Sequence, residues 1–192
     1  MVGLRERKKA ATRQALHEAA LRLAVEHGLG NVTVEAIADE VGVSRRTFSN
    51  YFEGKEDALL YGDRERMWLL LDAFAARPPG EPSWTALKHA VHDAFGDAPE
   101  SDPRWAVRGA LVRDHPALLA RQLGHYAALE QRLAELVAER DGTAAGSAAS
   151  RVRAAAFLAS LRIGLHRWLE DQSRPRTDVV DEALTEMARP FA

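Results

Sequence analysis

Arg45, Arg46, Ser49 and Asn50 are spaced so that they share one face of a short helix, and all four carry hydrogen-bond donors. An arginine can donate two hydrogen bonds to the O6 and N7 edge of guanine, which is the commonest specific base contact. Asparagine can read adenine or meet a phosphate. We therefore expect this face to enter the major groove of DNA, with at least one arginine on a base edge. Contact with phosphates alone is the alternative.

The sequence around this face predicts a helix-turn-helix. Residues 33–40 form a candidate first helix that Gly42 would end. The Ser44 hydroxyl can then cap a second helix by accepting a backbone N–H of its first turn. The apolar positions that would form the inner faces are Ile37, Val41, Val43, Phe48 and Phe52. Two short helices, a tight glycine turn and an outer face of arginine, serine and asparagine are typical of a DNA-reading helix-turn-helix.

The same run resembles the DNA-binding domain of TetR-family transcriptional repressors, and the resemblance is dense over residues 10–60. It is carried by Thr33, Ile37, Ala38, the Val41-Gly42-Val43-Ser44 turn, Thr47, Phe48, Tyr51, Phe52, Lys55 and the Leu59-Leu60 pair. Beyond this stretch, only the length and the helical layout agree with the family.

The resemblance implies an all-α protein of two domains. Residues 1–54 would form an N-terminal three-helix helix-turn-helix DNA-binding domain, and residues 55–192 a C-terminal helical bundle for ligand binding and dimerisation. It further implies a bacterial homodimer that binds a palindromic operator in double-stranded DNA and represses transcription. A small-molecule inducer would release it.

The resemblance also implies that Thr33, Thr47, Tyr51 and Lys55 contact the DNA backbone. We expect Ser44 to belong to the DNA-binding residues as well. Hydroxyl groups and a lysine near helix N-termini are good donors to phosphate. Thr33 could equally be a plain helix cap, and the two roles are compatible. Tyr51 could instead be partly core.

Basic residues gather at the N-terminus although the formal net charge of the 192 residues is −2. Residues 1–22 hold six basic and two acidic side chains, a local balance of +4. Phosphate binding needs a local basic face rather than a basic protein. Arg5, Arg7, Lys8 and Lys9 could form an arm that reaches a neighbouring groove, and a solvated tail is the alternative.

Several classes of protein are disfavoured by the composition. There is no cysteine, and no apolar run approaches the ~20 residues that span a bilayer. The basic start lacks the apolar stretch of a signal peptide, so we expect a cytoplasmic protein without a membrane partner. The usual glycine and serine signatures of enzymes are missing, and we expect neither an enzyme nor a cofactor.

His89, His92 and Asp93 form an H-x-x-H-D cluster on one predicted helix. A metal is conceivable because positions three apart share a face, but a third partner is missing, and we expect no metal site. Two other classes of protein are alternatives to a repressor. One is a helical enzyme that uses this cluster, and the other is a helical ligand-binding or scaffolding protein with a vestigial DNA-binding domain.

Aromatic and basic residues after residue 55 could line a ligand pocket. The candidates are His89, His92, Trp105, Arg108, Tyr126, Phe157, Arg162 and His166, and ordinary core packing is the alternative for each aromatic residue. The C-terminal layout is also similar to TetR relatives that sense acyl-coenzyme A or fatty-acyl compounds. We expect a largely apolar effector with an anionic or polar end.

The periodicity beyond the helix-turn-helix predicts helices over residues 55–76, 83–95, 104–114, 117–140, 148–172 and 178–189, after a first helix over residues 4–27. Gly28 and Ser83 are expected as a left-handed C-cap and an N-cap. We expect the last two helices to form the dimer interface. Its apolar positions would be Val152, Ala155, Ala156, Ala159, Leu165, Trp168, Val180, Ala183, Leu184 and Met187.

Overall fold

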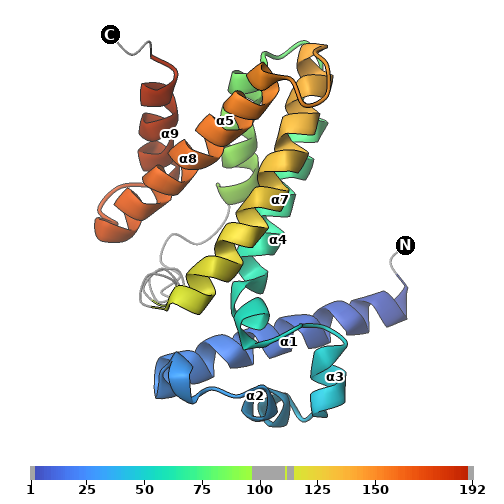
Figure 1. The fold of residues 1–192 in the computed structure, drawn as a ribbon. Coiled ribbons are helices and arrows are strands. Elements are labelled where there is room, and N and C mark those ends of the chain that lie inside the picture. The colour runs from blue at the N-terminus through green and yellow to red at the C-terminus, as the bar shows by residue number, and fades with distance from the viewer. Residues whose placement is uncertain (1–2, 97–110, 112–114, 190–192) are drawn as a thin grey trace. The chain divides into compact units, whose positions relative to one another are not determined.

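A computed structural model describes residues 3–96, 111 and 115–189, and every regular element in that part of the chain is a helix (Figure 1). The predicted all-α class is therefore confirmed. The elements are α1 (Leu4–His27), the 3₁₀ turn η1 (Leu29–Asn31), α2 (Val34–Val41), α3 (Arg45–Ser49), α4 (Lys55–Ala76), α5 (Ser83–Phe95), α7 (Pro116–Asp141), α8 (Ala148–Glu170) and α9 (Arg176–Met187). None of the described helices is long and apolar enough to cross a membrane.

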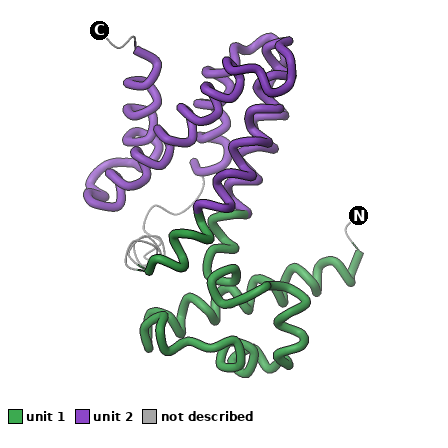
Figure 2. The backbone as a smooth tube through the Cα atoms, viewed as in Figure 1, with its two compact units in different colours: residues 1–64, 104–122 green, residues 65–103, 123–192 purple. Residues whose placement is uncertain are grey.

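The chain divides into two compact units (Figure 2). One unit is Met1–Arg64 with Arg104–Gln122, and the other is Glu65–Pro103 with Leu123–Ala192. Helices α4 and α7 each contribute residues to both units. The domain boundary after residue 54 stays a prediction.

The first unit has an apolar core built from α1, α2, α3 and the start of α4. Its large buried side chains include Leu16, Ile37, Phe48, Phe52, Leu59, Leu60 and Tyr61. Leu118 of α7 belongs to the same core. His17 is also buried there, with its Nδ1 2.7 Å from the carbonyl oxygen of Ala58. Helix α7 is thus anchored in the unit that carries the helix-turn-helix.

The second unit is stabilised by a close helix–helix contact and by the hydrogen bonds of one arginine. Helices α8 and α9 pack closely at Gly164, where an added Cβ would lie only 2.7 Å from the Cα of Val180. Arg140 of α7 caps the end of α4 and the following turn, and its guanidinium stacks 4.9 Å from the centre of the Phe74 ring. It donates to the carbonyl oxygens of Phe74, Arg77, Pro78 and Glu81 at 3.0, 2.9, 2.7 and 3.3 Å.

Some expected helix ends are wrong. Gly28 ends α1, but its φ of 75° comes with a ψ of 144°, which is outside the left-handed helical region. Ser83 is the first residue of α5 rather than its cap, because Pro82 takes the cap position and the Ser83 hydroxyl donates to Asp141 at 3.2 Å. The last helix begins at Arg176, two residues early, directly after Pro175. The helix expected over residues 104–114 lies outside the described residues, apart from Leu111.

Three residues expected at the dimer interface are buried inside the protomer. Val180, Leu184 and Trp168 are each at most 1% exposed. They form the contact between α8 and α9, because α9 turns its most apolar side to its own neighbour in the chain. The helices thus use these positions to close the protomer, and other residues must form any interface.

Candidate DNA interface and ligand residues

Two side-chain caps and one glycine fix the geometry of the helix-turn-helix. The Thr33 hydroxyl accepts the N–H of Ala36 at 3.1 Å, and the Ser44 hydroxyl accepts the N–H of Thr47 at 3.0 Å. Between the helices, Gly42 adopts φ 72° and ψ 33°, a left-handed conformation that residues with a Cβ rarely adopt. The predicted Ser44 cap and glycine turn are confirmed.

Helix α3 presents the four predicted side chains to solvent. Arg45, Arg46, Ser49 and Asn50 are all exposed, whereas Phe48 is buried. One helix therefore separates a core-facing aromatic ring from a polar outer face, as a recognition helix requires. The contacts of these four residues with DNA stay predictions.

The hydroxyl groups predicted to meet phosphates also have internal partners. The Thr33 and Ser44 hydroxyls cap their helices, and the hydroxyl of Thr47 lies 2.9 Å from that of Ser44. Tyr51 is half-buried, with the guanidinium of Arg13 at 5.8 Å from its ring centre. For Thr33 and Tyr51, the capping and core alternatives are therefore present in the structure, and phosphate contacts stay predictions.

Lys55 has an internal role that the sequence did not indicate. Its Nζ donates to the carbonyl oxygens of Leu29 and Val32 at 2.9 and 2.8 Å. These carbonyls belong to η1 and to the residue that follows it, just before the Thr33 cap of α2. The ammonium group thus ties the start of α4 to the entry of the helix-turn-helix, and two of its three donors are engaged.

Sequence reasoning missed an ionic cluster at the start of α4. Arg121 of α7 pairs with Glu53 and lies 3.9 Å from Asp57. Asp57 is buried, and Arg64 contacts it at 3.5 Å. The hydrogen bond with Glu53 raises the pKa of Arg121 above its usual value. The cluster connects α7 to the turn that follows the recognition helix.

Comparison with known proteins now identifies the family. A family model described as bacterial regulatory proteins, tetR family, matches residues 16–61, and one described as the MftR C-terminal domain matches residues 81–192, more than half of the chain. The chain belongs to the TetR family of transcriptional regulators. This is a family of DNA-binding regulators rather than of enzymes.

Individual TetR-family relatives agree with this membership. The chain is 35% identical to the HTH-type transcriptional regulator TcmR of Streptomyces glaucescens over 147 residues, which is 73% of this chain and 65%, just under two thirds, of TcmR. It is 25% identical to the mycofactocin biosynthesis transcriptional regulator MftR of Mycobacterium tuberculosis, over 93% of this chain and 90% of MftR. The solved structure of the fatty acid degradation regulator FadR from Bacillus halodurans has a similar fold, with a TM-score of 0.60 at 20% identity over 92% and 94% of the two chains.

TetR-family regulators bind small-molecule effectors, and the predicted ligand residues of this one that the structure describes lie on α5, α7 and α8. Trp105 and Arg108 lie outside the described residues. Phe157 is fully buried, with the Trp84 ring edge-on at 6.3 Å, so it occupies the core position that the sequence left open as an alternative. Arg162 and His166 are exposed on α8, and Tyr126 is half-buried on α7.

The two histidines of α5 form separate polar contacts in this TetR-family protein. His89 pairs with Glu81, and Arg77 lies 3.1 Å from the same ring nitrogen. The hydrogen bond from Arg77, and secondarily that from His89, lowers the pKa of Glu81 below its usual range. His92 lies 3.1 Å from Asp181 of α9. Within the described residues, no three histidine and acidic side chains gather as a metal site would require.

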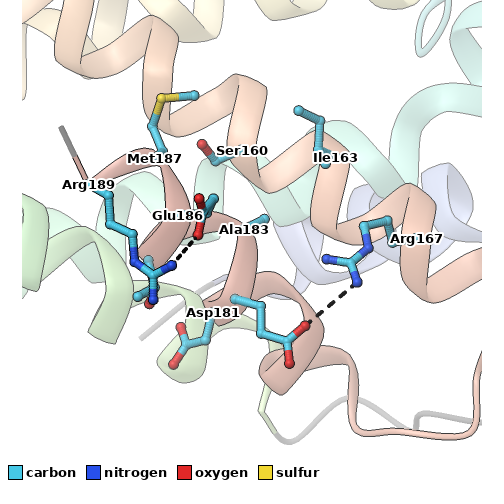
Figure 3. A pocket seen from close by; sticks show the side chains of 10 residues that line it. Ser160, Ile163, Arg167, Asp181, Ala183, Glu186, Met187 and Arg189 are labelled. Atoms are coloured by element: carbon cyan, nitrogen blue, oxygen red, sulfur yellow. Dashed lines mark hydrogen bonds and ion pairs between the residues drawn. The ribbon is translucent and has the colours of Figure 1, made fainter. Parts of the chain in front are cut away.

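A groove of about 610 Å³ lies along α8 and α9 of this regulator (Figure 3). It is lined by Ser160, Ile163, Arg167, Asp181, Glu182, Ala183, Thr185, Glu186, Met187 and Arg189. Its apolar lining residues are Ile163, Ala183 and Met187. Two ion pairs lie beside them, Arg167–Glu182 with an N···O distance of 3.7 Å and Arg189–Glu186 with one of 2.7 Å. None of the predicted ligand residues lines this groove.

Proposed function

We propose that this TetR-family regulator is a ligand-responsive repressor of the cytoplasm. A homodimer would bind a palindromic operator and would leave it when a small-molecule inducer binds. The observation that carries the DNA-binding part is the exposed polar face of α3, held in place by the Ser44 cap and the buried Phe48. Two such helices related by a two-fold axis fit two half-sites of opposite direction, which is why the operator should be palindromic.

The exposed side of α8 supports the homodimer. Val152 and Ile163 are 67% and 45% exposed, so two large aliphatic side chains of α8 face solvent in the protomer. Ala155, Ala156 and Ala159 lie between them along the helix and would allow a second helix to approach closely. The groove beside Ile163 continues this apolar surface onto α9. Covering it with the same surface of a second copy gives an isologous interface.

Helix α7 supports the coupling between ligand and DNA. Its residue Leu118 is part of the core around the helix-turn-helix, and Arg121 pairs with Glu53 just after the recognition helix. The same helix continues to Asp141, through the unit that would hold the ligand. A ligand that moved α7 would therefore strain contacts at the DNA-binding end. It can release DNA only as far as it prefers the conformation that does not bind.

The effector class is inferred from the side chains of the proposed ligand residues. The ligand residues that we propose, with Trp105 and Arg108 among them, combine aromatic and basic side chains, which suits an amphipathic compound with an anionic or polar end. A true inducer must raise the unfolding temperature and also weaken operator binding. Fatty acids, acyl-coenzyme A esters, aromatic acids and cationic drugs should be screened by both assays. If only cationic compounds pass both, the proposed anionic end is wrong.

The dimer is tested by placing charges on the exposed side of α8. We expect Val152→Glu combined with Ile163→Glu to give folded monomers by light scattering and to abolish operator binding, since one recognition helix makes half of the contacts. Val25→Glu is the matched control, because Val25 is 56% exposed on α1, outside the proposed interface. A double variant that remains dimeric would place the interface elsewhere. A duplex that the wild-type protein selects from a random pool can be compared with a scrambled duplex of equal length. If the protein binds both equally well, a ligand-binding or scaffolding protein with a vestigial DNA-binding domain is favoured.

A further inference from the structure

One of the two arginines on the recognition helix is held by a carboxylate from the neighbouring helix. Arg45 Nη1 lies 2.7 Å from Oε1 of Glu35, which stands in the first turn of α2. Both side chains are exposed, 73% for Arg45 and 52% for Glu35. Arg46, the next residue, has no ion-pair partner among the residues that the structure describes. Of the two adjacent arginines, only Arg45 is therefore paired with a carboxylate before DNA binds.

The ion pair joins two helices whose relative position is fixed by short-range contacts. The N–H of Val43 donates to the carbonyl oxygen of Ala38 at 2.9 Å across the glycine turn. Phe48 of α3 and Ile37 of α2 are buried in one core. Because both helices are fixed, the backbone positions of Glu35 and Arg45 are fixed as well, and the carboxylate stays within reach of the guanidinium. A long arginine side chain otherwise samples many rotamers.

We propose that Glu35 is a specificity-determining residue, which orients Arg45 toward a base edge and keeps it from phosphates. This inference rests on the proposed reading of DNA by α3. Arg45 has donors beyond the nitrogen that Glu35 engages, so a held guanidinium can still donate to guanine. A guanidinium that swings freely can bind any phosphate, which strengthens binding to every sequence alike.

A simpler reading is that Glu35 only stabilises α2, since an acidic residue in the first turn favours a helix. The exposure of the pair argues that its contribution to folding is small, because exposed ion pairs are screened by water. The Thr33 cap already satisfies the Ala36 N–H of the same turn. A change in DNA discrimination without a change in unfolding would therefore separate the two readings.

The experiment compares Glu35→Gln with Glu40→Gln in the full chain. Glu40 is a matched control, since it lies on the same helix and pairs with Arg22 at 2.8 Å, and its side chain is 42% exposed. The probes are a duplex selected from a random pool by the wild-type protein and a scrambled duplex of equal length, with binding followed by fluorescence anisotropy at several salt concentrations. Thermal unfolding is measured for each variant.

We expect Glu35→Gln to reduce the ratio of selected to scrambled affinity by at least about fivefold, mainly through tighter binding to scrambled DNA. The slope of log affinity against log salt on scrambled DNA should steepen by about one, for the phosphate that Arg45 gains. Glu40→Gln should leave both unchanged. In an Arg45→Ala background, Glu35→Gln should have no further effect on the ratio.

Three results would overturn the inference: an unchanged ratio for Glu35→Gln, an equal change for Glu40→Gln, or a full effect in the Arg45→Ala background. The last two results would mean that the net charge of the protein changes the affinity ratio and that the ion pair with Arg45 does not. A wild-type protein that does not discriminate between the two duplexes would instead overturn the proposed function, and this inference with it.

Discussion

Replacing Lys55 with methionine removes the ammonium group and keeps most of the aliphatic chain, so it tests two roles of this residue together. The ammonium donates to two carbonyl oxygens, those of Leu29 and Val32, at 2.9 and 2.8 Å. A hydrogen bond with a charged partner contributes ~1.5–3 kcal/mol to stability, and the low end applies because Lys55 is only half-buried. Losing two such bonds should lower the free energy of unfolding by about 3 kcal/mol.

Calorimetry or circular dichroism would show this loss as a fall in the unfolding midpoint of roughly 6–12 °C for a chain of this size. These two contacts use two of the three donors of Lys55, and the resemblance to the family predicts that Lys55 also contacts a DNA phosphate. We therefore predict weaker binding to selected and scrambled DNA alike, and a salt slope that is shallower by about one. Lys88→Met removes the same charge from α5 and should leave the slope unchanged.

The two readouts refute different parts of this reasoning. If Lys55→Met unfolds at the wild-type temperature, the two carbonyl contacts do not stabilise the helix-turn-helix. If the protein is destabilised but its salt slope stays at the wild-type value, Lys55 positions the backbone without touching phosphate. Binding should be measured well below the unfolding midpoint of the variant, so that the loss of folded protein does not imitate weaker affinity.

Three further predictions concern the ligand-binding unit and folding. Arg140→Ala should lower the free energy of unfolding by about 3–5 kcal/mol in chemical denaturation, because four carbonyl oxygens lose a charged donor; a loss below about 1 kcal/mol would contradict this. Gly164→Ala should cost about 1–3 kcal/mol, since its Cβ would meet the backbone of Val180, whereas Gly124→Ala, with open space around its Cβ, should be neutral or stabilising. Glu81 has a pKa below its usual value of 4.5 in the folded state because it accepts hydrogen bonds from Arg77 and His89. The stability that the ionised Glu81 adds to the folded state is therefore fully present above pH 4.5 and is lost as the pH falls through the lowered pKa. Glu81→Gln should therefore flatten the acid limb of the stability profile, and an unchanged limb would exclude this role.

The features that the sequence predicted well are local ones. The Ser44 cap joins a hydroxyl to a backbone N–H three residues away, so its partner is fixed by the helix itself. The extent of α4, Lys55–Ala76, was predicted without error because the prolines at 78 and 79 follow soon after it. The outward face of α3 followed from the helical period once Phe48 was assigned to the core.

The features that escaped prediction depend on tertiary packing. Arg121 and Glu53 are 68 residues apart, and Lys55 is 23 residues from the carbonyl of Val32, so no local pattern joins them. Helical periodicity also shows which residues of α9 share a face but not what that face meets. Leu184 was therefore assigned to a partner subunit when it packs within its own chain. Glu35 carried one local signal, its place in the first turn of a predicted helix, but its pairing with Arg45 required the turn geometry.

The way in which α3 is built has a consequence for the divergence of related regulators. The groups that fold this helix are the Ser44 hydroxyl, the Phe48 ring and the turn at Gly42. The exposed side chains of Arg46, Ser49 and Asn50 take no part in that folding. Exposed substitutions of this kind usually change the free energy of unfolding by less than about 0.5 kcal/mol. After a gene duplication, the outer face of α3 can therefore accumulate replacements and acquire a new DNA preference while the fold remains intact, so each copy can come under selection for its own set of promoters.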